Sequence, residues 1–351
     1  MNSQKIKIGI TQGDINGIGY EIIIKGLLDQ RILEICTPIV YGSLKVAAYH
    51  RKALNIENFS LTSIKSPDEA NTKRANIINC LDDNVRVELG KSTEIAGDAS
   101  YTALMKAVED LKNNKLDALI TAPINKYNIQ SDKFSFPGHT EFLKDYFGSN
   151  DALMLMVSDL FKIGVITTHI PISEISSVLT EEMILNKIHL LNDSLIRDFG
   201  IRKPKIALLG LNPHAGEEGM IGSEEKDIIL PAINKAKEEN IYCFGPFPSD
   251  GFFGSGDFMN FDATLAMYHD QGLIPFKSMV MDEGVNYTAG LPIIRTSPAH
   301  GTAFDLAGKN QASPNSFLKA IYTACDIHKN RKLHGDLNKN PLDVNDLNDL
   351  E

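Results

Sequence analysis

The sequence predicts an α/β fold with largely parallel sheets. Short apolar runs alternate along the chain with longer segments of helical periodicity, which is typical of this class. The chain has 351 residues, of which 43% are hydrophobic and 23% charged, so it can form two domains or one large one. No internal repeat or low-complexity linker interrupts the alternation.

Each expected strand is a short apolar run. The strands are predicted at 5–10, 38–41, 117–121, 162–168, 205–210 and 263–268, the last also being compatible with a buried helix. Helices are predicted at 19–28, from Ser43 as N-cap, and at 98–113, 180–198 and 223–239. The Asn-, Asp- and Lys-rich stretch at 336–351 is expected to be a loose tail.

Charge and cysteine usage exclude several classes of protein. Lys and Arg total 35 against 45 Asp and Glu, and no segment concentrates the cations, so nucleic-acid binding is not expected. Cys36, Cys80, Cys243 and Cys325 form no CxxC pair and are expected to be reduced thiols. The N-terminus lacks a signal-peptide core, and no apolar run approaches the roughly 20 residues of a membrane helix. A soluble cytoplasmic protein without membrane partners is expected.

Histidines recur in short segments rich in Gly, Pro and Thr. Five of the nine do so: His139, His169, His214, His269 and His300. Three of them directly follow predicted strands, and ligands of open α/β sheets bind beyond the carboxyl ends of strands. Three imidazoles with an open coordination position suit a catalytic metal. The long gaps match no local ligand motif, so structural roles remain an alternative.

A second group of residues suits an anionic ligand. Arg295, Lys277 and Asn286 lie near these histidine segments, and an Arg fork binds carboxylate or phosphate well. His139 and Thr140 precede a helix-like segment at 141–147, where Thr140 would be the N-cap of a phosphate-binding helix end. Solvated surface charges are the alternative for Arg295 and Lys277. The glycines at 13–19 do not match GxGxxG, so no Rossmann site is expected.

Seven ordered segments carry a resemblance over about residues 1–325. They are TQGD at 11–14 with GIG at 17–19, TAPINK at 121–126, PGHTEFL at 137–143, TTHIP at 167–171, LNPHAGE at 211–217, YHDQG at 268–272, and GLPIIRT at 290–296 with HGT at 300–302. Together they resemble the 4-hydroxythreonine-4-phosphate dehydrogenase family of vitamin B6 (pyridoxal phosphate) biosynthesis. The resemblance implies two α/β/α domains around a cleft, an isocitrate/isopropylmalate dehydrogenase-like fold, and non-Rossmann NAD binding.

The resemblance also implies an arrangement of domains and subunits. The expected first domain comprises 1–130 and 300–335, and the second comprises 131–299. The second is expected to hold most metal and substrate residues and the interface of a homodimer whose active sites are shared.

The resemblance assigns roles to individual positions. Metal ligands are expected at His169, His214 and His269, and substrate-binding residues at His139, Thr140, Lys277, Asn286 and Arg295. Asp250 and Lys277 are the expected catalytic residues, and His300, Gly301 and Asn310 the expected cofactor-binding residues. One divalent metal per site, Zn, Mg, Mn or Co, and either NAD or NADP are implied.

The implied reaction is NAD(P)-linked oxidation of 4-phosphohydroxy-L-threonine. Its product, 2-amino-3-oxo-4-phosphooxybutanoate, decarboxylates to 3-amino-2-oxopropyl phosphate. One alternative is a paralogous catabolic dehydrogenase acting on a cis-dihydrodiol dicarboxylate or a four-carbon phosphorylated hydroxy acid. Another is a metal-dependent phosphohydrolase or a non-catalytic phosphoacid-binding protein, although no clustered DxH or HD motif supports a hydrolase.

Overall fold

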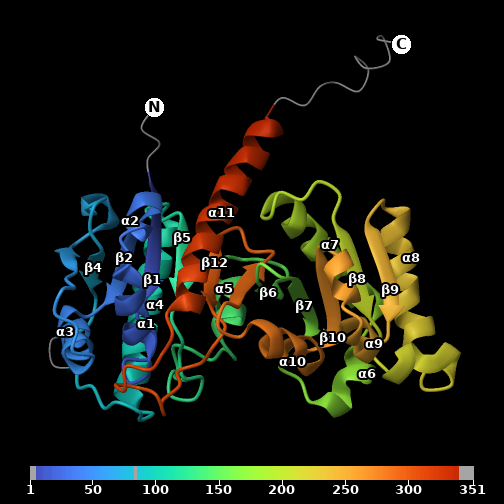
Figure 1. The fold of residues 1–351 in the computed structure, drawn as a ribbon, viewed down its shortest axis with the longest axis horizontal. Helices are drawn as coiled ribbons and strands as arrows, with labels where there is room; N and C mark the ends of the chain where they lie inside the picture. The colour runs from blue at the N-terminus through green and yellow to red at the C-terminus, as the bar shows by residue number, and fades with distance from the viewer. Residues whose placement is uncertain (1–4, 83–84, 340–351) are drawn as a thin grey trace, which may run out of the picture.

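A single mixed sheet forms the centre of the molecule in the computed structural model, which describes residues 5–82 and 85–339 (Figure 1). The twelve strands of the described residues have the spatial order β3 (Thr62–Ile64), β4 (Asn76–Asn79), β2 (Cys36–Gly42), β1 (Ile6–Thr11), β5 (Ala118–Thr121), β12 (Arg295–Pro298), β11 (Val285–Ala289), β6 (Leu153–Val157), β7 (Lys162–Thr167), β10 (Ala263–Tyr268), β8 (Lys205–Leu209) and β9 (Tyr242–Phe247). The predicted α/β class is confirmed.

The helices flank this sheet. They are α1 (Gly19–Leu27), α2 (Ile32–Ile35), α3 (Leu44–Ala53), α4 (Glu94–Lys112), α5 (His139–Tyr146), α6 (Ile175–Val178), α7 (Glu181–Arg197), α8 (Leu230–Glu238), α9 (Ser249–Gly254), α10 (His269–Val280) and α11 (Asn315–Leu337). In Figure 1 the N-terminal elements and the β8–β9 end occupy opposite sides, with β12, α5 and β6 between them. Within the described ranges, none of the helices has the length and apolarity to cross a bilayer.

Most strand pairs are parallel, as predicted, but the strand pairs at the centre of the sheet are antiparallel. Strand β11 is antiparallel to both β12 and β6, and β6 is antiparallel to β7. Beyond this antiparallel seam, β7, β10 and β8 are parallel neighbours. Their carboxyl ends therefore lie at one edge of the sheet, and His169, His214 and His269 follow those three ends.

The predicted strands and helices are found with small shifts at their ends. Ser43 is the N-cap of α3, where its side chain accepts a hydrogen bond from the Val46 amide. The predicted helix at 223–239 is divided into a π-helical turn, Glu225–Ile229, and α8. The predicted tail at 336–351 begins too early, because α11 extends to Leu337. Residues 340–351 of that tail lie outside the described residues.

Candidate active site

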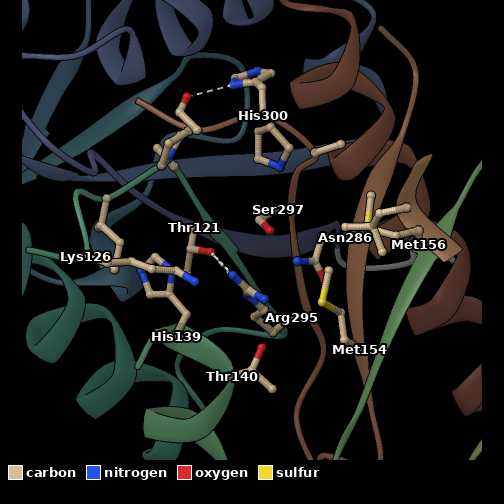
Figure 2. A pocket seen from close by; sticks show the side chains of 18 of the residues that line it. Thr121, Lys126, His139, Thr140, Met154, Met156, Asn286, Arg295, Ser297 and His300 are labelled. Atoms are coloured by element: carbon tan, nitrogen blue, oxygen red, sulfur yellow. Dashed lines mark hydrogen bonds between the residues drawn. The ribbon is translucent and has the colours of Figure 1, made fainter. Parts of the chain in front are cut away.

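A pocket of ≈ 240 Å³ lies where β5, β12, β11, α5 and α10 meet, and it gathers most of the predicted site residues. Figure 2 shows side chains from opposite walls of this pocket pointing toward one another. The predicted residues that line it are His139, Thr140, His169, His269, Lys277, Asn286, Arg295, His300 and Gly301. Sequence reasoning thus identified residues that are distant in the chain and adjacent in space.

Arg295 is the most deeply buried charge in this pocket, with 3% of its surface exposed. Its Nε and Nη2 donate to Thr121 Oγ1 at 3.1 and 2.7 Å (Figure 2). Its Nη1 donates to Thr288 Oγ1 at 3.1 Å. All of these partners are neutral hydroxyls. Burial lowers the pKa of Arg295 to about 10, against a smaller opposite effect of Glu141. The guanidinium stays charged at neutral pH, and its desolvation is not compensated by a bonded carboxylate.

His139 is buried beside this cation and its Nε2 has no hydrogen-bond partner among the described residues. Burial, with the nearby charges of Arg295 and Lys126, holds the pKa of His139 well below its usual value. The imidazole is therefore neutral at pH 7. Asn286 Oδ1 is a second buried polar atom without a partner, on the opposite wall. Such unpaired groups fit a polar ligand that completes their hydrogen bonds.

The neutral His139 predicts a pH effect on stability. Below about pH 6.5 the unfolded chain binds a proton on His139, whereas the folded protein keeps this imidazole neutral. The contribution of His139 to the free energy of unfolding is therefore constant above about pH 6.5. Below that pH the free energy of unfolding decreases, by up to about 1.4 kcal/mol per pH unit. In metal-free protein, His139→Asn is expected to reduce the loss of Tm between pH 7.5 and 5.5. His50 and His300, whose pKa values burial also lowers, retain part of the slope.

Thermal denaturation followed by circular dichroism at both pH values measures this effect. The matched control is His334→Asn, at the last turn of α11, which should keep the wild-type slope. An unchanged slope in His139→Asn would contradict a neutral His139.

Two of the predicted metal ligands have the hydrogen bonds that metal-binding histidines require. His169 Nδ1 lies 3.1 Å from Glu141 Oε1, and His269 Nδ1 lies 2.7 Å from Asp270 Oδ1. A carboxylate behind one ring nitrogen fixes the tautomer and leaves Nε2 for a metal. Although burial raises the pKa of Glu141, the hydrogen bond with His169, a backbone hydrogen bond and the nearby charges of His169 and Lys126 together outweigh burial, and the pKa is lowered. The donor set therefore fits a divalent cation.

His214 and Asp250 lie in a neighbouring cavity of ≈ 560 Å³ rather than in this pocket. The first residues of α10 separate the two, since His269 faces one and Asp270 the other. His214 is in a left-handed turn with φ 52°, part of the segment Pro213–Gly219. No group of three His, Cys, Asp or Glu converges as a metal site within 5–82 and 85–339. One chain alone does not bring the three predicted ligands together.

Two other predictions differ from the structure. Helix α5 begins at His139 with Gly138 as N-cap, so Thr140 is in the first turn and not the predicted N-cap. The structure places Asn310 away from the pocket, where its Nδ2 approaches Leu54 O at 3.5 Å.

Sequence reasoning assigned no role to several polar residues of the pocket, namely Thr121, Lys126, Glu141 and Ser297. The TAPINK segment after β5 was a signal for the first two, since polar residues after a strand end are candidates for ligand contact.

Comparison with known proteins places the chain among named relatives. A family model described as "Pyridoxal phosphate biosynthetic protein PdxA" matches residues 34–324. The 4-hydroxythreonine-4-phosphate dehydrogenase of Bacteroides thetaiotaomicron is 52% identical over 344 residues, which cover 97% of this chain and 94% of that protein. The D-threonate 4-phosphate dehydrogenase of Cupriavidus necator is 37% identical over 92% of this chain and 98% of its own length.

Solved structures agree with these relatives. The 4-hydroxythreonine-4-phosphate dehydrogenase from Klebsiella pneumoniae has a TM-score of 0.82 at 34% identity, covering 93% of this chain and 99% of that one. Isocitrate dehydrogenase from Methylococcus capsulatus has a TM-score of 0.52 at 13% identity, covering 93% and 87%. The second similarity concerns the fold alone and confirms the expected isocitrate dehydrogenase-like architecture.

Proposed function

The chain belongs to the PdxA family of pyridoxal phosphate biosynthetic proteins, and from that premise we propose that it oxidises 4-phosphohydroxy-L-threonine with NAD or NADP. The 3-oxo acid formed, 2-amino-3-oxo-4-phosphooxybutanoate, loses carbon dioxide to give 3-amino-2-oxopropyl phosphate. The B. thetaiotaomicron and K. pneumoniae relatives carry the corresponding enzyme name.

The buried guanidinium of Arg295 is the observation that carries this proposal. Among the described residues, this buried cation is bonded only to hydroxyls, and it lines a pocket; it is arranged for an anionic ligand, whose charge replaces the hydration that the guanidinium lost. Lys277, Thr140 and the neutral His139 line the same small space and provide further donors. A substrate with a phosphate at one end and a carboxylate at the other matches this set.

The metal site is proposed to be shared by two copies of the chain. His169 and His269 of one pocket would be completed by His214 of a second copy, and Asp250 of that copy would lie near the reacting carbon. The cavity that holds His214 and Asp250 is also lined by Leu211, Phe253 and Ile274, so the polar groups that a second copy would contribute lie beside apolar side chains. Zn, Mg, Mn and Co remain candidates, although imidazole ligands favour Zn over Mg.

The pocket residues have distinct parts in the proposed reaction. When bound, a divalent cation supplies Lewis-acid polarisation of the C3 hydroxyl, and the nicotinamide accepts the hydride. Either Lys277 of the same chain or Asp250 of the second copy accepts the hydroxyl proton. The same group then donates a proton to the carbon that has lost carbon dioxide. Arg295 and His139 hold the anionic groups still, and His300 and Gly301 border the side on which we expect the cofactor.

A related substrate remains the second candidate. The C. necator relative is a D-threonate 4-phosphate dehydrogenase, and D-threonate 4-phosphate has a hydroxyl where 4-phosphohydroxy-L-threonine has an amino group. Asn286 Oδ1, one of the buried pocket atoms without a hydrogen-bond partner among the described residues, can accept a hydrogen bond from either group. Both substrates retain the phosphate, so they share the anion-binding argument.

Absorbance at 340 nm measures NADH or NADPH formation and tests the proposal. We expect turnover with 4-phosphohydroxy-L-threonine that stops with chelator and returns with metal. D-Threonate 4-phosphate and a cis-dihydrodiol dicarboxylate are the comparison substrates. Faster turnover of either comparison substrate assigns the chain to that reaction instead, and phosphate release without a nicotinamide would support a phosphohydrolase.

His214→Ala tests the shared metal site. The variant is expected to lose metal binding and turnover together, because the third imidazole comes from the second copy. Metal content by mass spectrometry and the absorbance assay report the two losses separately. His189→Ala, a histidine that pairs with Glu239 away from both cavities, is the matched control and should keep both. Full turnover without metal in His214→Ala would contradict the shared site.

A further inference from the structure

Lys126 occupies the position on His169 where a metal would bind. It follows β5 in the TAPINK segment and lines the pocket, and Figure 2 shows its side chain beside His139. Its Nζ lies 3.1 Å from His169 Nε2. In the described part of the chain, no carboxylate forms an ion pair with Lys126. Its hydrogen-bond partner there is an imidazole rather than an anion.

The hydrogen bonds of His169 define which nitrogen is protonated. An ammonium group has donors and no acceptor, so His169 Nε2 must offer its lone pair to Lys126. The proton is therefore on Nδ1, which donates to Glu141 Oε1 at 3.1 Å. This is the tautomer that a carboxylate-backed histidine presents to a metal, with the same Nε2 lone pair. Lys126 and a divalent cation thus require the same electron pair.

We propose that Lys126 is a stand-in for the metal: in the metal-free protein, its hydrogen bond keeps His169 in the metal-binding tautomer. When metal binds, Lys126 is displaced toward the anionic substrate. This inference rests on the proposed function, because it takes the metal and the phosphorylated substrate from it. Two cations cannot share one lone pair, and their charges repel at such short range. The four-carbon stem of Lys126 lets Nζ move to an anionic group that enters the pocket.

The proposal predicts opposite effects of one substitution on two ligands. Lys126→Met keeps the stem and removes the ammonium, so the competitor for His169 Nε2 disappears. Metal binding should become about tenfold tighter, the factor that corresponds to one charge-assisted hydrogen bond. Substrate affinity should decrease, with a KM about tenfold higher. A residue that only bound substrate would raise KM and leave the metal affinity unchanged.

Titration calorimetry of the metal-free protein with Co²⁺ is the decisive measurement. Lys277→Met is the matched control, since Lys277 lines the same pocket and is not hydrogen-bonded to His169. It reports the general effect of removing one positive charge. The expected order of Co²⁺ affinity is Lys126→Met above Lys277→Met, and Lys277→Met equal to or slightly above wild type.

The outcomes separate this inference from the proposed function. If the two variants bind Co²⁺ equally well and wild type forms NADH from the phosphorylated substrate, the stand-in role of Lys126 is contradicted and the proposed function is supported. Tighter Co²⁺ binding by Lys126→Met, without NADH formation by wild type on any of the substrates, supports the stand-in and overturns the function. Absence of Co²⁺ binding by wild type and by both variants overturns the stand-in and the proposed metal site together.

Discussion

Arg295→Met is expected to lower kcat/KM for the phosphorylated substrate by about 10²–10³-fold, the loss that follows removal of one partner of a buried charged pair. The same variant is expected to have a Tm equal to or above that of wild type. In the ligand-free protein the guanidinium is desolvated, and among the described residues it is bonded only to Thr121 and Thr288. Its removal therefore eliminates an unfavourable desolvation free energy from the folded state. Steady-state kinetics and thermal denaturation provide the two readouts.

Arg331→Met is the matched control for this prediction. Arg331 donates from Nε to Asp198 Oδ1 at 2.7 Å, so its charge is paired with a buried carboxylate. Its replacement should lower Tm and leave kcat/KM close to wild type in the protein that remains folded. A large Tm loss in Arg295→Met would show that Arg295 stabilises the core, contrary to the reading of this residue as a ligand site.

Asp198→Asn is expected to lower the free energy of unfolding by about 3–5 kcal/mol, the usual effect of breaking a buried ion pair. Asp198 is at the end of α7 and accepts hydrogen bonds from Arg197, Arg331 and Tyr287 Oη. These partners connect α7, α11 and β11. Although burial raises the pKa of Asp198, the two guanidinium groups outweigh it and lower the pKa to about 2.

The sign of this shift predicts the pH dependence of Asp198→Asn. The folded protein keeps Asp198 ionised where the unfolded chain binds a proton, so the stabilisation is complete above about pH 4 and declines toward pH 2. Urea unfolding followed by circular dichroism at pH 7, 4 and 2.5 should show a constant difference between variant and wild type that shrinks only at the lowest pH. Asp326→Asn, an exposed carboxylate on α11, is the control and should be nearly neutral. A difference that persists unchanged at pH 2.5 would contradict the ionic origin.

Elements with their own periodic pattern could be predicted from the sequence. Strands β1, β7 and β8 are short apolar runs, and the Ser43 N-cap is a local signal, so the prediction of these features does not depend on distant residues. Strand β12 has the sequence RTSP, which carries no strand pattern. It becomes a strand because β5 on one side and β11 on the other complete its hydrogen bonds. Tertiary context of this kind is absent from any local window.

The sequence predicted that several of the candidate residues would lie close together, but it did not predict how they are arranged. Residues that follow strand ends, such as His169 and His269, were found because strand ends meet at one edge. His214 lies in a second cavity because of the left-handed turn at 214–218, and the local sequence does not predict this turn. Lys126 was not assigned a role from the sequence, because its proposed role depends on a tertiary contact with His169.

The position of β12 has a consequence for the order in which a ribosome can complete this molecule. Its residues 295–298 pair with β5 at 118–121, so the middle of the sheet stays open until about 175 further residues have been synthesised after β5. Arg295 lies in that late strand, and α11, which packs against it, is made later still. A nascent chain therefore reaches its anion-binding capacity only after β12 has been synthesised and has paired with β5. Any prematurely terminated product that ends before Arg295 lacks this buried cation, however much of the remaining fold it has formed.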